Sequence, residues 1–354
     1  WGDFWSVGAA WRLSEEEFFQ TSVLRDYVDN FKVKASYGTQ GNDAIGGDYA
    51  LYLDQFSVSN VDGKPGISLS YRGNPDLTWE KSTNFNVGFE SSFLKNRLMV
   101  EFDYFIKVTS DMLFNRRLAP SVGVPSTIAD NGMEMQNEGV ELTLTGVLAK
   151  KKNFNWNMNI NFALNRNTVT GLNNGQYSLL SGVNWEKNFN SQSPYITQVG
   201  KPSGLMYGYI YEGTYKNADF EGTMLKDGVP YLSSVGQKAV RPGDPKYSDI
   251  NNDGVVDDND RTIIGCGQPL HTGGFGNTFN FYGFDLNIFF AWSYGNDVIN
   301  ANRLYFENGS ITNTNQLKSY TQRWTEANPT SDIPRVGADF RTADVDGRTD
   351  DFIA

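Results

Sequence analysis

The feature that most constrains this chain is an alternation of apolar and polar side chains with a period of two. Residues 154–164 show it most clearly, because every even position is apolar and every odd position except Ala163 is Asn. The apolar set is Phe154, Trp156, Met158, Ile160, Phe162 and Leu164. Since successive side chains of a β-strand point to opposite faces, this segment predicts a strand with one apolar and one amide-lined face.

The same pattern recurs along the chain. The predicted strands are 4–13, 30–38, 82–93, 97–108, 138–149, 154–165, 274–281 and 284–294. A strand tilted in a bilayer needs about 9–11 residues to cross it, which is close to the length of each segment. Aromatic residues gather near the strand ends, among them Trp5, Trp11, Trp156, Trp292 and Tyr294. This distribution is typical of the aromatic girdles of outer-membrane barrels.

The connections between these strands alternate between short and long. The turns 94–96, 150–153 and 282–283 are short, whereas 109–137 and 166–273 are long. Outer-membrane barrels have short periplasmic turns and long extracellular loops, so the alternation favours such a barrel. The alternative is a soluble β-sandwich whose aromatic side chains fill a core, but a sandwich gives no reason for the alternation.

The predicted fold class is therefore all-β, an antiparallel transmembrane β-barrel. An interior of eight strands is only just wide enough for side chains, while the polar face here carries many charged residues and Asn. We therefore expect about eight strands of a larger barrel. The chain begins at Trp1, and strands beyond it are expected to complete the barrel, because lipid does not tolerate an open sheet edge.

Composition excludes several classes of function. The net charge of −11 opposes nucleic-acid binding, which needs a basic surface. One Cys and one His, Cys266 and His271, rule out an internal disulfide and a multi-histidine metal site. We predict no catalytic residue and no cofactor-binding residue, so the chain is not expected to be an enzyme. Ser14, followed by three glutamates, predicts a capping box that opens a short helix.

The longest connection contains a calcium-type motif at 249–260. Oxygen ligands fall at positions 1, 3, 5, 9 and 12, Gly254 is at position 6, and the carbonyl of position 7 is available. The predicted ligands are Asp249, Asn251, Asp253, Val255, Asp257 and Asp260. Because no amphipathic helices flank the loop, we expect Ca²⁺ to have a structural role. The alternative is an Asx-rich turn that binds no metal.

Several segments together resemble the SusC/RagA family of TonB-linked outer-membrane proteins. They occur in the order found in that family and span nearly the whole chain. The segments are FWSVGAAWRLSEEEFF, FKVKASYGTQGN, NPDLTWEKSTNFNVGFE, LMVEFDYFIKVTSDMLF, MQNEGVELTLTG, GLMYGYIYEGTY, RPGDPKYSDINNDGVVDDNDRTIIG and GGFGNTFNFYGFDLNIFFAW.

The resemblance implies a 22-stranded barrel in the outer membrane of Bacteroidetes that imports oligosaccharides or peptides. Its expected partners are a SusD-like surface lipoprotein that acts as a lid and a TonB complex that acts through an N-terminal plug. The plug is absent from residues 1–354, so the chain is expected to be a C-terminal-half piece. A calcium-stabilised adhesin or lectin is the alternative function.

Two further sets of residues are candidate contacts for a solute. Tyr207, Tyr209, Tyr211 and Tyr215 lie in the longest connection, where their rings could stack on a sugar or pack within the loop. The asparagines of 155–161 are expected on the inner wall, where they could line a path for solute or simply hold water.

Overall fold

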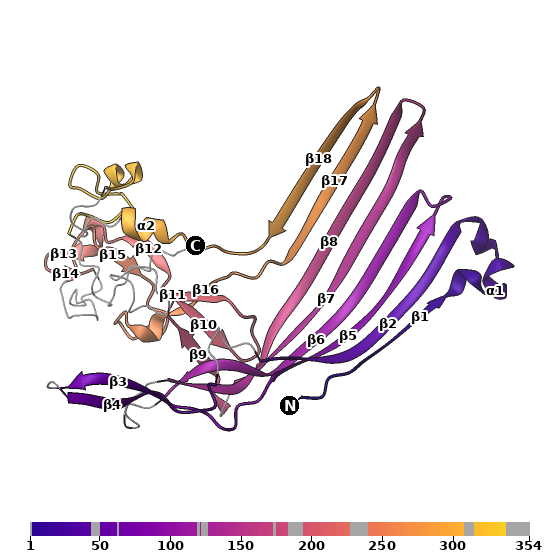
Figure 1. Ribbon diagram of the computed structural model, residues 1–354. Coiled ribbons are helices and arrows are strands. Elements are labelled where there is room, and N and C mark those ends of the chain that lie inside the picture. Colours follow the sequence, from indigo (N-terminus) through magenta and orange to yellow (C-terminus); the bar gives the residue numbers. More distant parts are fainter. Residues whose placement is uncertain are drawn as a thin grey trace. The chain divides into compact units, whose positions relative to one another are not determined.

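The computed structural model describes residues 2–43, 50–61, 64–118, 121, 127–172, 175–182, 194–226, 240–307 and 315–337. The chain divides into two compact units (Figure 1). The first comprises Trp1–Ser178, Gln198–Pro202 and Pro269–Gly295, and the second comprises Leu179–Thr197, Ser203–Gln268 and Asn296–Ala354. Each unit is described below by itself.

The first unit is built on one eight-stranded antiparallel sheet (Figure 1). Its strands are β1 (Ser6–Arg12), β2 (Val28–Asn42), β5 (Glu80–Phe93), β6 (Leu98–Arg117), β7 (Thr127–Lys151), β8 (Phe154–Gly171), β17 (His271–Phe281) and β18 (Phe284–Tyr294). They lie side by side in this order, so each strand pairs with its neighbours in the series. Each predicted strand overlaps one of these eight. β1 and β18 are the two edges, so the sheet is open.

The register places most of the large apolar side chains of the sheet on one face, with Phe105 and Phe289 as exceptions on the opposite face. A residue of one strand pairs with a residue of the next, and following these pairs across all eight strands gives one row of side chains on this apolar face. The row is Trp11, Val33, Phe89, Phe102, Leu142, Phe162, Gly273 and Trp292. The adjacent row lies on the opposite, polar face. It is Ala10, Lys34, Gly88, Asp103, Glu141, Ala163, Thr272 and Ser293. The alternation in the sequence therefore corresponds to two chemically distinct faces.

The register also gives the inclination of the strands. One row of paired residues begins at Arg12, the last residue of β1, and ends at Ala291 of β18. Ala291 lies seven residues after Phe284, which follows the β17–β18 turn, so the strands are staggered by seven residues across the sheet. Seven residues rise about 23 Å along a strand, while seven strand spacings measure about 34 Å. When the turns at this edge lie in one plane parallel to the membrane, the strands tilt by about 35° from the membrane normal. This is the tilt of strands in outer-membrane barrels.

The apolar face has the height of a hydrocarbon layer. From Phe154 to Leu164 the apolar side of β8 runs about 33 Å along the strand, or about 27 Å along the membrane normal at this tilt. Outer-membrane barrels carry an apolar band of about 25 Å. The alternating segment of β8 is therefore long enough to span the hydrocarbon layer.

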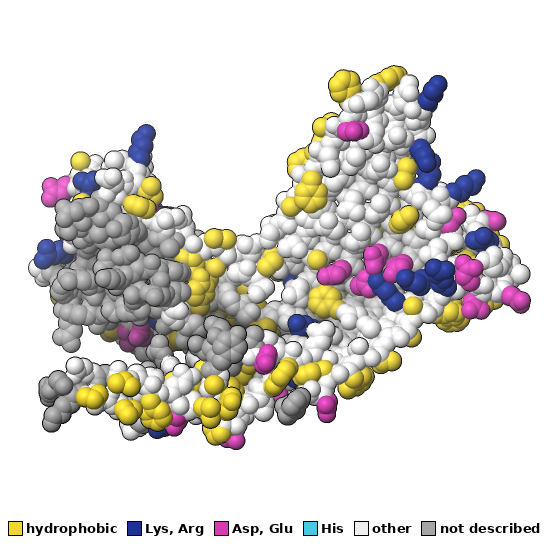
Figure 2. Space-filling model, in the orientation of Figure 1, with side chains coloured by type: hydrophobic (Ala, Val, Ile, Leu, Met, Phe, Trp, Pro, Cys, Tyr) yellow, Lys and Arg dark blue, Asp and Glu magenta, His cyan; other side chains and the backbone are white. Residues whose placement is uncertain are grey.

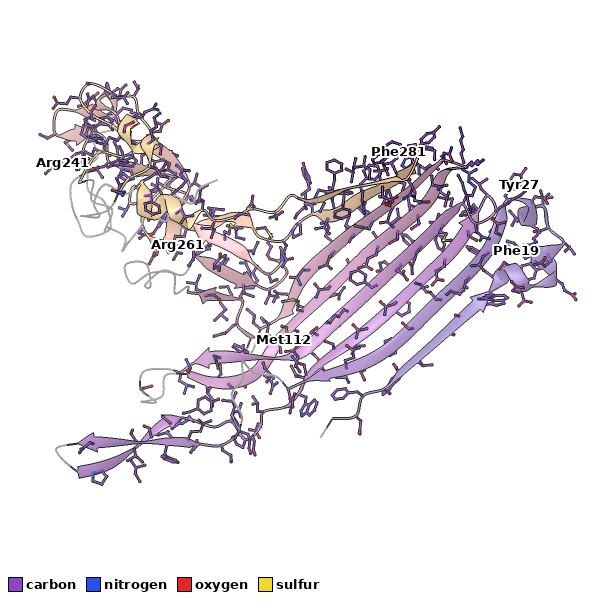
Figure 3. The ribbon with its side chains drawn as sticks, turned by 45° about the horizontal axis from the view of Figure 1, so that its top comes forward. Phe19, Tyr27, Met112, Arg241, Arg261 and Phe281 are labelled. Carbon is purple, nitrogen blue, oxygen red and sulfur yellow. The ribbon has the colours of Figure 1, made fainter. Side chains whose placement is uncertain are left out.

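No second layer of protein packs on the apolar face within the described part of the first unit. The buried apolar side chains there are Phe19, Leu51, Ile128, Ala129 and Val169, and none belongs to the row above. Large side chains on the apolar face remain exposed, including Trp5 at 55%, Phe284 at 68% and Phe290 at 61%. A β-sandwich would bury these groups in a core, so the sandwich alternative is wrong for this sheet. Figure 3 shows side chains projecting from both sides of the sheet.

Asn277 is a polar side chain that lies on the apolar face and is satisfied there. Asn277 is buried, and its Oδ1 accepts a hydrogen bond of 2.9 Å from the indole Nε1 of Trp156. The Trp156 ring stacks on Phe279, with ring centroids 5.5 Å apart. Because an unpaired amide oxygen in an apolar environment costs free energy, this bond explains how an Asn is tolerated among aromatic rings.

The connection between β1 and β2 differs from its prediction. It contains η1 (Leu13–Glu15), α1 (Glu17–Gln20) and η2 (Val23–Asp26), so a short helix forms. The capping box is wrong, because α1 begins after Glu16 and has no side-chain cap. Ser14 is buried, and its hydroxyl is hydrogen-bonded to Asn30 Oδ1 on β2 instead.

The long connections also contain strands that the sequence did not predict. The hairpin β3 (Gln55–Val61) and β4 (Lys64–Tyr71) lies between β2 and β5. β6 and β7 extend to Arg117 and from Thr127, well beyond the apolar part of either strand. A pair of strands outside the lipid layer needs no apolar face. The extended parts of β6 and β7 therefore show only a weak alternation of apolar and polar residues in the sequence.

The described residues of the predicted loop 166–273 include many short strands, most of which belong to the second unit. Its strands are β9 (Ser178–Ser181), β10 (Tyr195–Gln198), β11 (Leu205–Gly208), β12 (Tyr211–Thr214), β13 (Phe220–Glu221), β14 (Met224–Leu225), β15 (Pro245–Tyr247) and β16 (Thr262–Cys266). Its helices are η6 (Asn217–Asp219), η7 (Asp258–Asp260), α2 (Ala301–Phe306) and η8 (Lys318–Gln322). β16, β11, β10 and β9 form a four-stranded sheet. None of the helices among the described residues is both long and apolar enough to cross a membrane.

A charge introduced on the apolar face should destabilise the protein far more than the same charge one residue away. We expect Leu142→Arg to lower the free energy of unfolding from phospholipid vesicles by about 2–4 kcal/mol, because the guanidinium would lie in hydrocarbon. Thr143→Arg is the matched control on the polar face. Urea titration of the refolded protein measures both, and an equal loss for the two variants would contradict the assignment of the faces.

Candidate functional site

A cluster of five charged side chains lies on the polar face of β2, β5 and β6. Lys34 Nζ lies 3.4 Å from Glu90, 2.7 Å from Glu101 and 3.0 Å from Asp103, while Lys32 pairs with Glu90 at 2.5 Å. Figure 2 shows blue and magenta side chains gathered over this part of the sheet. These groups come from three adjacent strands, so the cluster ties the strands together on the side away from lipid.

Gly88 makes this cluster possible. Lys34 is opposite Gly88, and Gly88 is opposite Asp103, so the lysine must reach across a whole strand to meet the aspartate. A Cβ on Gly88 would lie 2.3 Å from Asp103 Oδ1 and 2.3 Å from the carbonyl oxygen of Phe102. Without a side chain at this position, the lysine and the carboxylate can approach each other directly.

The polar face is suited to contact water and polar solutes. The five charged side chains remain between 25% and 47% exposed, so solvent screens each pair and none contributes much stability alone. The Asn residues of β8 lie on the same face, where Asn159 donates to Thr145 Oγ1 at 3.1 Å. The arrangement forms a hydrated wall with both charge signs, which can exchange weak contacts with a polar solute.

The acidic loop 249–260 is folded by its own side chains. The Asp249 carboxylate accepts from the backbone of Asp253 at 3.3 Å and of Gly254 at 2.8 Å. Asp253 Oδ1 accepts from Val255 N at 2.9 Å, and Asn251 Oδ1 accepts from Asp253 N at 2.9 Å. Gly254 has a φ of +84°, a conformation that favours glycine. These bonds bend the chain tightly around its acidic side chains.

Asp260, at position 12 of the motif, has a different role from the others. It is fully buried, and its Oδ1 accepts from Ile250 N at 2.8 Å while its Oδ2 accepts from Asp257 N at 2.7 Å. Both carboxylate oxygens therefore hold the two ends of the loop together. This geometry makes Asp260 a cross-link of the loop, and it opposes a bidentate contact from this residue to an ion.

Calcium binding by this loop stays a prediction. Among the described residues, no group of three or more His, Cys, Asp and Glu side chains is placed to hold a metal ion. The donor set still suits a hard cation, since Asp249, Asp253 and Asp257 supply carboxylate oxygens and Val255 a carbonyl oxygen. The backbone hydrogen bonds alone also match the alternative of an Asx-rich turn.

The four tyrosines of the long connection make contacts within the second unit. Tyr209 is buried, and its hydroxyl lies 3.3 Å from Asp258 Oδ1. Burial raises the pKa of the Tyr209 phenol, so the phenol remains a hydrogen-bond donor. The Arg261 guanidinium lies 4.7 Å from the Tyr207 ring centroid. Tyr211 packs against Tyr247, and Tyr215 packs against Phe220. These contacts support packing within the loop.

A hollow of about 530 Å³ adjoins the acidic loop in the second unit. Its lining includes Tyr215, Tyr247, Glu212, Lys246 and Asp249. Lys246 lies 3.9 Å from Glu212 and 5.8 Å from the Tyr215 ring centroid. Aromatic, basic and acidic groups thus surround one space. The sequence identified Tyr215 and Asp249, but no spacing signal pointed to the other lining residues.

The segment 315–337 is fastened to the long connection by polar contacts that the sequence did not predict. Lys216 Nζ lies 2.9 Å from Asp332 Oδ1, and Thr214 Oγ1 donates to the carbonyl oxygen of Ser331 at 2.6 Å. Arg335 Nε lies 2.8 Å from the buried Asp244 carboxylate. Burial raises the pKa of Asp244, and the Arg335 charge opposes this increase. The contacts of Lys216 and Thr214 join parts of the chain more than a hundred residues apart.

His271 belongs to an aromatic cluster on the apolar face. Its ring stacks on Tyr294 with centroids 5.1 Å apart and lies 5.4 Å from Phe162. Nδ1 of His271 accepts a hydrogen bond of 3.2 Å from the Trp292 indole. The single histidine of the chain is thus part of the aromatic belt.

Comparison with known proteins decides the family. The model of the family described as TonB dependent receptor-like, beta-barrel matches residues 1–262. The chain belongs to this family. The receptor barrel is 30% identical over 335 residues to TonB-dependent receptor P3 of Formosa agariphila, a match that covers 94% of this chain and 32% of that protein. It is 25% identical to TonB-dependent receptor SusC of Bacteroides thetaiotaomicron, covering 74% of this chain and 24% of SusC.

A solved structure shows the same architecture. The RagAB peptide transporter matches with a TM-score of 0.75 and 28% identity, over 94% of this chain and 34% of the transporter chain. The receptor barrel thus spans about a third of the length of the relatives that it matches. The resemblance to the SusC/RagA family, the transmembrane barrel fold and the outer-membrane location are confirmed. These relatives carry the names of receptors and of a transporter, in agreement with the expectation that the chain is not an enzyme.

Lys34 should matter more to the receptor barrel than Lys32, because it contacts three carboxylates and Lys32 contacts one. We expect Lys34→Met to cost about 1 kcal/mol more folding free energy than Lys32→Met, since it leaves Glu101 and Asp103 without a cation. Urea titration in vesicles at low and high salt measures the difference, which should shrink at high salt. Equal losses at both salt concentrations would show that the cluster does not act as a unit.

Calcium should protect the acidic loop from proteolysis. Adding Ca²⁺ to the intact protein should slow cleavage within 249–260, and Asp249→Asn or Asp253→Asn should raise the concentration needed on the order of tenfold. Asn259→Ser is the control, because Asn259 is exposed and is not a predicted ligand. Mass spectrometry of the fragments locates the cuts. If chelation of Ca²⁺ leaves cleavage unchanged, the loop is an Asx-rich turn.

Proposed function

We propose that the protein containing this barrel imports oligosaccharides or peptides across the outer membrane, driven by a TonB complex. The observation that carries the proposal is the two-faced sheet, which has an apolar band of membrane height on one side and a hydrated, charged wall on the other. A sheet of this kind separates lipid from a water-filled interior, and a water-filled interior admits a polar solute.

The partners of the import system follow from the relatives. A SusD-like surface lipoprotein is proposed as a lid over the extracellular loops, since SusC and the RagAB peptide transporter are among the relatives. The TonB complex is proposed to act through an N-terminal plug. Contact with cargo is assigned to the second unit and to the polar face, because both present mixed charges and hydrogen-bonding groups to water.

The cargo class is left as oligosaccharide or peptide, and the two differ in what they require. A peptide brings its own charges, which the polar face can meet with Lys34, Glu101 and Asp103. A sugar brings apolar ring faces, which stack on aromatic rings such as those of Tyr215 and Tyr247 beside the hollow. A structural Ca²⁺ in the acidic loop remains part of the proposal. An adhesin or lectin is the alternative function, and it predicts binding of a glycan without uptake.

Uptake in the parent organism tests the proposal. Deleting the gene should abolish growth on the cargo as the sole carbon or nitrogen source, and deleting TonB should do the same, because transport requires energy from the inner membrane. Separate cultures on oligosaccharide mixtures and on peptide mixtures distinguish the two cargo classes. Expression of the intact gene is the control.

Two results would count against import. Growth that is unaffected by the gene deletion on every mixture would contradict it. Binding of a glycan at the cell surface without TonB-dependent uptake would favour the adhesin or lectin. Co-purification with a surface lipoprotein from detergent extracts tests the lid separately, so that the partner can fail while import stands.

A further inference from the structure

The connection between β1 and β2 is unlike the others at the same edge of the sheet. The remaining connections there are hairpin turns near 94–97, 152–153 and 282–283, whereas this one spans 13–27. It displays four exposed large apolar side chains. They are Phe18 at 59%, Val23 at 76%, Leu24 at 56% and Tyr27 at 65%. Such a concentration of exposed apolar groups is typical of a surface that meets a partner or a membrane.

Phe18 continues the lipid-facing surface into this connection. Trp11 lies on the apolar face, opposite Val33, and the Phe18 ring packs edge-on against it with centroids 6.4 Å apart. At the same edge, Val28, Phe93 and Leu98 are successive partners and extend the apolar face towards the turns. Through Phe18, the connection 13–27 is therefore joined to the membrane-facing band by direct contact.

The connection is held firmly against the sheet. Phe19 is buried next to the exposed Phe18, and the buried Ser14 is hydrogen-bonded to Asn30 on β2. The Trp11 indole donates to Glu16 Oε1 at 2.8 Å, so its ring faces apolar surroundings while its N–H meets a polar group. This is the environment that tryptophan takes at a membrane interface.

We propose that residues 13–27 lie in the interface of the periplasmic leaflet, with Phe18, Val23, Leu24 and Tyr27 inserted among phospholipids. The short turns at this edge identify it as periplasmic. The segment carries more acidic than basic side chains, so zwitterionic headgroups suit it better than anionic ones. The segment then acts as a second anchor that sets the height of the barrel in the membrane. The proposal rests on the outer-membrane location and is independent of import.

Fluorescence quenching in bilayers tests the proposal. The full-length receptor with Cys266→Ser and no other cysteine is reconstituted in phosphatidylcholine nanodiscs. Phe18→Cys and Leu24→Cys are each labelled with an environment-sensitive fluorophore, and Glu17→Cys is the matched control beside Phe18. We expect the first two labels to be blue-shifted and to lose more emission to a nitroxide on the upper acyl chain than to aqueous iodide. The control label should show the reverse order.

Two outcomes would overturn the proposal. Labels at Phe18 and Leu24 that iodide reaches as readily as the control label would place the segment in water. Labels shielded from both quenchers would show that protein covers it. Because Phe18 packs on Trp11, Val23→Cys replaces Phe18→Cys if that variant does not fold. Uptake by cells that express the same variants is measured in parallel, so that a failure of import is distinguished from a failure of anchoring.

Discussion

The structure depends on one constraint, which is that backbone polar groups in hydrocarbon must be paired inside the protein. Strands β2, β5, β6, β7, β8 and β17 each pair with a neighbour on both sides, so the sheet itself supplies backbone partners to its interior strands. Lipid can then take the place of a protein core on the outer face. This explains why so few apolar side chains are buried among the described residues of the first unit, and why large aromatic groups remain on its surface.

The polar face follows from the same constraint. Once lipid covers one side, the other side has no core to fill and can carry charges at low cost. The Lys34 cluster uses this freedom, because its members are hydrated and span three strands over the gap left by Gly88. A larger residue at position 88 would separate Lys34 from Asp103. The same wall therefore links adjacent strands and presents both charge signs to the interior.

Period-two alternation predicted the barrel because it reports burial in lipid directly. It identified β8 from Phe154 onward and the row through Leu142 and Phe102, where each side chain must face either lipid or water. The alternation was a poorer guide in the long connections, where a side chain does not have to face either lipid or the interior. In the hairpin β3–β4 serines alternate with exposed apolar residues, so the pattern is present although the hairpin is missing from the predicted strands, and β6 continues to Arg117 without an apolar face. Ser14 shows a different failure, since its hydrogen bond to Asn30 depends on a strand that follows it by sixteen residues.

In the second unit, only the part of the site formed by residues close together in the sequence could be predicted. The acidic loop is encoded within twelve residues, and Asp249, Asp253 and Gly254 form the bend that their spacing indicates. Even there, the pattern could not show that Asp260 would use both oxygens on backbone amides. The clamp of Arg335 on Asp244 joins residues ninety-one positions apart, so no window of sequence contains it. The contacts that shape the second unit therefore depend on long-range pairing, whereas the sheet of the first unit is specified strand by strand.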